Sequence, residues 1–178
     1  MTTFQLDQNS NHRRFAAQCN ADGHCIVKRL PRELTDEDDS VILTTILPSG
    51  ATLLSMDFAL VCNNGQHVIA NNWGVIIVKA RPNTHELMTN MVRRFKSKFP
   101  KWWETDWRRI YMEIEENEIY ASILIDGNVD NGRTVSFADE DFAASLESCL
   151  TALREEGEAL LAVHEEERSK PTLGQISD

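Results

Sequence analysis

Two short segments of the chain place cysteine and histidine at the same spacing. Residues 15–26 and 58–69 both read F-A-x-x-C-N-x-x-x-H-x-I, with a turn-prone tetrapeptide between Cys and His. The four side chains at these positions are Cys19, His24, Cys62 and His67. Two thiolates and two imidazoles form a ligand set that structural zinc sites use. Because Cys-x4-His is not the spacing of standard zinc fingers, we favour a second interpretation, a hairpin used twice with small buried thiols, and expect no metal.

Acidic residues gather on one predicted hairpin and the loop after it. They are Glu113, Glu115, Glu118 and Asp126. Such a set could hold a divalent cation or act as paired acids, but a solvated sheet face explains it more simply. The chain has no G-x-S-x-G, G-x-G-x-x-G, P-loop or H-E-x-x-H motif. We therefore expect no enzyme, no catalytic residue and no cofactor.

Residues 81–109 combine positive charge with aromatic rings. They hold eight of the 18 Lys and Arg residues beside three acids, and three of the four tryptophans, in a chain of net charge −10. Residues 110–178 hold four basic and 17 acidic residues. A basic aromatic segment beside a strongly acidic one indicates a surface for a partner, or two parts that neutralise each other.

The tryptophans of this segment have two interpretations. Adjacent Trp102 and Trp103 cannot both point inward easily in a helix or a strand, and one exposed tryptophan ringed by basic residues has the composition of a binding hot spot. Alternatively, the rings fill a corner of the core where a helix ends and a hairpin begins. The residues that we predict to bind a partner are Lys101, Trp102, Trp103, Trp107, Arg108 and Arg109.

The first 80 residues predict antiparallel strands that must position these side chains. The predicted strands are residues 41–47, 52–54, 58–61, 67–70 and 75–79. Each run is rich in β-branched residues, and each break uses Gly, Pro or Asn, which tolerate turn dihedrals.

A helix is predicted over about residues 84–99. Its apolar residues recur every four positions and are Leu87, Met91, Phe95 and Phe99. Asn83 can cap its start, and Pro100 stops it.

A hairpin is predicted over about residues 109–126, with its turn at Glu116–Asn117. This turn pairs Ile114 with Ile119, Met112 with Ala121 and Ile110 with Ile123 on one side of the sheet. A slip of one residue would move this aliphatic set into water, so the register is well specified.

A second helix is predicted over about residues 138–167, with a break or bend at Gly157. Its apolar stripe from Phe142 to Leu161 is longer than one small core can cover, so we expect it to support a homodimer. The order of elements predicts an α+β fold, an antiparallel meander with helices on one face. Residues 1–170 would form a single domain, and residues 171–178 a flexible tail.

Composition and charge predict how the protein acts. With 42% hydrophobic and 26% charged residues it is an ordinary folded chain. It lacks the ~20-residue apolar run of a membrane span and the apolar segment of a secretion signal, so we expect a cytoplasmic protein without membrane contact. We predict that it binds another macromolecule, foremost another protein, as inhibitors, immunity proteins and chaperones or adaptors do. The alternative is a nucleic-acid-binding protein that uses the basic, tryptophan-rich residues 93–109.

Overall fold

The protein is a single α/β domain built on one seven-stranded mixed sheet. The computed structural model describes residues 2–10, 12–20, 26–46, 50–60, 63, 74–125 and 128–169. Its strands are β1 (Thr3–Leu6), β2 (Ile26–Lys28), β3 (Thr52–Ser55), β4 (Val75–Val78), β5 (Ile110–Ile114), β6 (Glu118–Ile125) and β7 (Asn128–Ser136). Its helices are α1 (Arg13–Asn20), the short 3-10 helix η1 (Arg32–Leu34), α2 (Asp39–Ile46), α4 (His85–Lys98) and α5 (Phe142–Ser169).

The strand order is β2-β1-β3-β4-β5-β6-β7. Strands β1 to β5 are mutually parallel, whereas β6 and β7 continue the sheet in antiparallel fashion. The predicted α+β class is therefore corrected to α/β, because antiparallel pairing is confined to the C-terminal meander β5–β7.

The predicted antiparallel strands of the first 80 residues are wrong as a pattern. Segments 52–54 and 75–78 do form strands, but β3 and β4 pair in parallel. Every residue of both strands is buried. Parallel strands covered on both faces show such continuous apolar runs instead of alternation. Predicted strand 67–70 lies outside the described residues.

Residues 41–46 were predicted as a strand but lie in α2. Asp39 stands in the first turn, where a negative charge favours a helix N-terminus. Thr44 and Thr45 donate hydroxyl hydrogen bonds to the carbonyls of Ser40 (2.9 Å) and Val41 (2.8 Å), so both hydroxyls are satisfied within the helix. Residues 58–60 are helical as well, and not a strand.

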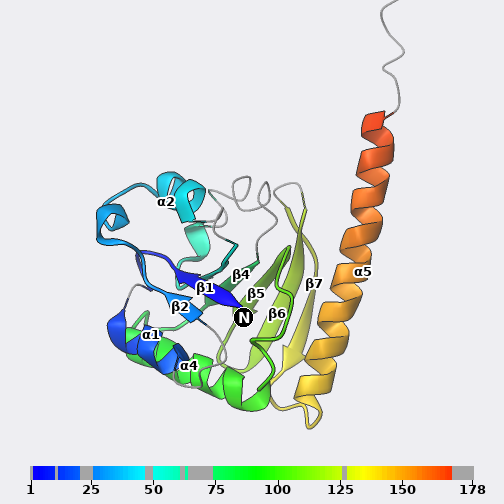
Figure 1. Cartoon of the computed structure of the whole chain (residues 1–178). Helices are drawn as coiled ribbons and strands as arrows, with labels where there is room; N and C mark the ends of the chain where they lie inside the picture. Colours follow the sequence, from blue (N-terminus) through cyan, green and yellow to red (C-terminus); the bar gives the residue numbers. More distant parts are fainter. Residues whose placement is uncertain are drawn as a thin grey trace, which may run out of the picture.

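Helices cover both faces of the sheet (Figure 1). On one face, α1, α4 and α5 enclose a core that includes Phe15, Phe95 and Leu146. On the other face, Ile42 and Leu43 of α2 pack against residues of β3, β4 and β5.

The predicted helix over residues 84–99 and the predicted hairpin over residues 109–126 are confirmed. Helix α4 follows the expected range, although Thr84 and not Asn83 is its N-cap, accepting a hydrogen bond from the Leu87 amide (3.3 Å). The β5–β6 hairpin has the predicted register, with Ile110 opposite Ile123, Met112 opposite Ala121 and Ile114 opposite Ile119.

Helix α5 has 28 residues, about 42 Å at ~1.5 Å per residue. It begins at Phe142 and runs through Gly157 without the predicted break. Among the residues of α5 whose burial is described, Gly157 is the last buried one. It lies close to the side chain of Ile123. Beyond it the helix projects past the sheet (Figure 1), and Leu160 and Val163 are 38% and 53% exposed. The predicted tail, residues 171–178, lies outside the described residues.

Candidate functional site

The tryptophans of the predicted binding segment are largely core residues. Trp102 and Trp107 are each only 2% exposed. The Trp102 ring stacks on Phe4 (4.5 Å between centroids), and the Trp107 indole donates to the Trp102 carbonyl (3.0 Å). Trp103 is half-buried and packs against the same core. The structure thus places the rings as the predicted structural corner, and the surface of this segment is left to its basic residues.

Two of the predicted basic residues stand together at the start of β5. Arg108 is exposed and forms a two-pronged pair with the Asp106 carboxylate, with Nε 2.9 Å from Oδ1 and Nη2 2.5 Å from Oδ2. Arg109 is half-buried, has a positive φ of 61°, and its carbonyl accepts the Leu124 amide (2.9 Å). Lys101 is exposed but belongs to a neighbouring hollow beside α5.

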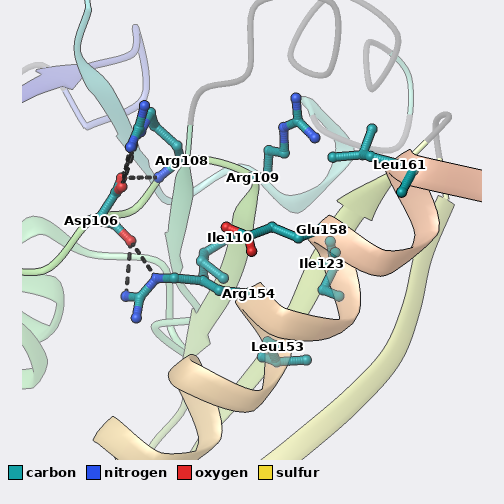
Figure 2. Close-up of a pocket in the computed structure, with 11 residues that line it drawn as sticks. Asp106, Arg108, Arg109, Ile110, Ile123, Leu153, Arg154, Glu158 and Leu161 are labelled. Carbon is teal, nitrogen blue, oxygen red and sulfur yellow. Dashed lines mark hydrogen bonds and ion pairs between the residues drawn. The ribbon is translucent and has the colours of Figure 1, made fainter. Parts of the chain in front are cut away.

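Arg108 and Arg109 line a cavity of about 410 Å³ between the β5–β6 hairpin and α5. Apolar side chains from the hairpin and the helix form its floor, and they are Ile110, Ile123, Leu153 and Leu161. A third arginine, Arg154 of α5, lies at its rim (Figure 2). We call this site the arginine pocket.

Arg154 was missed by sequence reasoning. Its Nε and Nη2 donate to the Asp106 carbonyl at 3.2 and 3.0 Å, so Asp106 lies between two guanidinium groups (Figure 2). The sequence does hold one indication of its importance: Arg154 is the one Lys or Arg residue between positions 134 and 167, in an acidic stretch. Only the fold brings it beside a segment 48 residues earlier.

The charges at the pocket are mostly fixed by these contacts. Hydrogen bonding from Arg108 is the main reason that the pKa of Asp106 lies below its ordinary value of 3.8, although partial burial opposes this shift. Asp106 therefore stays ionised and orients Arg108. Glu158 is the other acid of the lining, and it reaches from α5 toward Ile110 (Figure 2). Three arginines against two acids leave a positive rim over an apolar floor.

Gly74, just before β4, permits the close packing of the loop that carries these arginines. A Cβ atom at this position would overlap the backbone carbonyl of Trp107. No side chain can therefore be accommodated there unless the loop of residues 105–109 moves. The backbone approach helps to hold Arg108 and Arg109 at the mouth of the pocket.

The other predicted clusters have different surroundings. Glu113 is not on a solvated face as predicted, because it is 5% exposed and pairs with Lys79, which also binds Glu115 (3.1 Å). Glu118 is exposed, and Asp126 lies outside the described residues. Cys19 is buried in helix α1, while His24, Cys62 and His67 lie outside the described residues. Within the described part of the chain, no three His, Cys, Asp or Glu side chains converge as metal ligands.

α/β proteins commonly bind ligands at the carboxyl edge of their parallel strands, and here hydrogen bonds join the carboxyl ends of β1 and β3. Asp7 follows β1 and is buried. Its carboxylate accepts from the Ser10 amide (2.9 Å), from the Ser10 hydroxyl and from the Ser55 hydroxyl (2.6 Å). Burial is the main cause that raises the pKa of Asp7. The Asp7 carboxylate thus links the end of β1 to β3 through Ser55 and to the following loop through Ser10.

Comparison with protein-family models, with curated proteins and with solved structures gives no match for this chain. Among the described residues, no helix combines the length and hydrophobicity needed to cross a membrane.

Proposed function

We propose that the protein acts by binding another protein, without catalysis, and that the arginine pocket receives the partner. The supporting observation is the apolar floor of the pocket beside the guanidinium groups of Arg108 and Arg109. A partner segment that fits this site presents a large apolar side chain with carboxylates next to it. Inhibitors, immunity proteins, chaperones and adaptors act in this way, by occupying a surface of another protein.

The chemistry of the lining favours binding over turnover. Among the 11 described residues that line the pocket, none carries a hydroxyl, thiol, imidazole or amine. Asp106 is already committed to Arg108, and a carboxylate with a lowered pKa is a poor general acid at neutral pH. Arginine forks match carboxylates in a two-pronged geometry, and arginine is enriched in binding hot spots.

The pocket suits a protein better than a nucleic acid. Trp102 and Trp107 are buried, so their rings offer no stacking surface for bases. Glu158 lines the pocket, and Glu155 precedes it on the same helix, where both carboxylates would repel phosphates. An acidic protein segment carries fewer negative charges than a nucleic acid, so the glutamates repel it less. Its apolar side chain can also pack on the apolar floor of the pocket.

The test uses two pocket variants and one matched control. Leu161→Asp places a charge on the floor, Arg108→Glu reverses the rim, and Lys101→Glu reverses an exposed basic residue outside the pocket. Each purified variant and the wild type capture proteins from the native host, with quantitative mass spectrometry as the readout. A partner is expected that both pocket variants lose and the control retains.

Direct titration of that partner then measures affinity. Each pocket variant should bind at least about ten-fold more weakly, which is ~1.4 kcal/mol, with an unchanged melting temperature. Retention of every captured protein by both pocket variants would refute the proposal. The proposal would also be refuted if partner binding decreased only in proportion to the loss of thermal stability of each variant.

A further inference from the structure

The helices α1 and α4 form a second, independent charged surface. They lie side by side on one face of the sheet (Figure 1), where Arg93 donates to the Gln18 amide oxygen (3.4 Å) and Lys96 to the Cys19 carbonyl (3.5 Å). Six basic residues stand on these two helices, and they are Arg13, Arg14, Arg93, Arg94, Lys96 and Lys98. We call these six residues the basic face. Glu86 is the only acid on either helix, in a chain of net charge −10.

Among the described residues, no carboxylate pairs with Arg93 or Arg94 of this face. Arg93 donates to the amide oxygens of Asn90 (3.0 Å) and Gln18, and Arg94 donates to the backbone carbonyl of Glu116 (2.6 Å). Elsewhere in the described chain, Arg108 and Arg133 each pair with a carboxylate. The positive charge of the exposed arginines of this face is therefore available to an external anion.

The N-terminus of α1 also favours the binding of an anion. Its first turn carries Arg13 and Arg14, both exposed, and no acid. Positive charges at a helix N-terminus oppose the helix dipole, so this arrangement is unfavourable within the isolated protein. An anion bound there would be attracted both by the arginines and by the helix end.

We propose that the basic face binds the phosphate backbone of double-stranded nucleic acid, independently of sequence. The exposed large hydrophobic residues of the described chain include none on α1 or α4, so the face lacks the apolar centre of a protein interface. The two helices also carry the polar residues Gln18, Asn90 and Ser97. Arg and Lys with amide and hydroxyl side chains are the usual contacts to phosphates.

The duplex form follows from the surface chemistry of the face. Binding of single strands relies on exposed aromatic rings that stack on bases. The rings beside the basic face are covered: Lys96 lies over Trp102, which is itself buried, and Arg94 lies over the buried Phe137. The face therefore offers charged side chains without stacking rings, and such a surface suits the regularly spaced phosphates of a duplex.

The overall negative charge weakens this attraction without abolishing it. The acidic residues 33–39 belong to the segment leading into α2, on the other face of the sheet. The acidic residues of α5 share the face of α4, and Asp139, just before α5, interacts electrostatically with Lys98. At 0.1 M salt the Debye length is about 10 Å, so charges across the sheet are largely screened. Affinity in the range of non-specific binding, about 10⁻⁴ to 10⁻⁶ M, is therefore expected.

Fluorescence anisotropy with a labelled 20-base-pair DNA duplex, and with a duplex RNA, tests the proposal over a series of salt concentrations. The wild type should bind both, and the logarithm of its affinity should fall linearly with the logarithm of salt concentration, by ~0.9 for each phosphate contacted. The triple variant Arg13→Ala, Arg14→Ala, Arg93→Ala should bind at least ten-fold more weakly, with a smaller salt slope. Arg32→Ala with Arg133→Ala, two arginines outside the face, is the matched control and should bind like the wild type.

Three results would overturn the inference. They are no binding of either duplex at about 20 mM salt, equal weakening in the control, and tighter binding of poly-glutamate than of duplex. The last result would assign the face to an acidic protein. The pocket variants Arg108→Glu and Leu161→Asp should bind duplex normally, so failure of this proposal is distinguishable from failure of the protein-binding proposal.

Discussion

Arg154 of α5 donates two hydrogen bonds, of 3.2 and 3.0 Å, to the backbone carbonyl of Asp106. The one basic residue in this acidic stretch therefore ties the C-terminal helix to the loop before β5. Because the Asp106 carboxylate in turn orients Arg108, the same contact links the helix to the rim of the arginine pocket.

Arg154→Ala should destabilise the protein by about 1–2 kcal/mol, since hydrogen bonds to a charged group contribute on that order. Urea unfolding measures the change. Glu158→Ala, one turn further along the same helix, should change the free energy of unfolding by less than about 0.5 kcal/mol. An equal loss in both variants would show that the tie to Asp106 has no special weight.

Trp107→Ala should cost about 3–5 kcal/mol of folding stability, because it removes a buried ring and leaves a cavity. Trp102→Ala should behave similarly, whereas Lys101→Ala should have little effect at its exposed position. Thermal unfolding of the three variants distinguishes the two original interpretations. If the Trp102→Ala variant were as stable as the wild type but failed to bind a partner, the interpretation of an exposed binding hot spot would be supported instead.

Gly74→Ala and Gly157→Ala should act in opposite directions. At Gly74 the new methyl group would overlap the Trp107 carbonyl, so we expect a loss of more than ~2 kcal/mol or failure to fold. At Gly157 the nearest neighbour is a methyl of Ile123 at 3.4 Å, and alanine favours a helix over glycine by up to ~1 kcal/mol. Melting temperatures below and above that of the wild type, respectively, are the expected result.

Asp7 should make the free energy of unfolding depend on pH. Burial raises its folded-state pKa above the ordinary 3.8, so the folded protein holds this proton more tightly than the unfolded chain does. Unfolding releases the proton in that window, and the stability contributed by Asp7 therefore falls as pH rises from about 3.8 to the folded-state pKa, then levels off. Asp7→Asn lacks this dependence.

Urea titrations of wild type and Asp7→Asn at several pH values from about 4 to 8 isolate the effect, since other groups cancel in the difference. The stability of the wild type relative to the variant should decrease as pH rises. A constant difference over this range would show that Asp7 is not desolvated in solution.

Self-association through α5 stays a prediction, and the exposed Leu160 and Val163 are the residues to change. Sedimentation should show a reversible dimer whose population falls in Leu160→Glu, because the charge interrupts the apolar stripe beyond Gly157. Glu155→Lys, an exposed change on the same helix, is the control. A monomer at all accessible concentrations would end this idea.

Local periodicity determined helix α4 and the β5–β6 hairpin, but not strand β7 or the unbroken course of α5. Helix α4 follows from apolar residues every fourth position, and the register of the β5–β6 hairpin follows from the alternation of Ile110, Met112 and Ile114. These patterns are informative because each element buries one side, and the pairing partners lie within a few residues along the chain.

Only the tertiary structure decided the direction of the strands and the composition of the pocket. The runs 41–46 and 75–78 are both rich in aliphatic, β-branched residues, and a short apolar run does not distinguish a buried helix from a buried strand. One forms α2 and the other forms β4, because neighbours far along the chain cover them. Likewise, Arg154 reaches Asp106 across 48 residues and Trp107 packs against Gly74, which are contacts that no local pattern encodes. Burial depends on which surfaces meet, and that is a property of the whole fold.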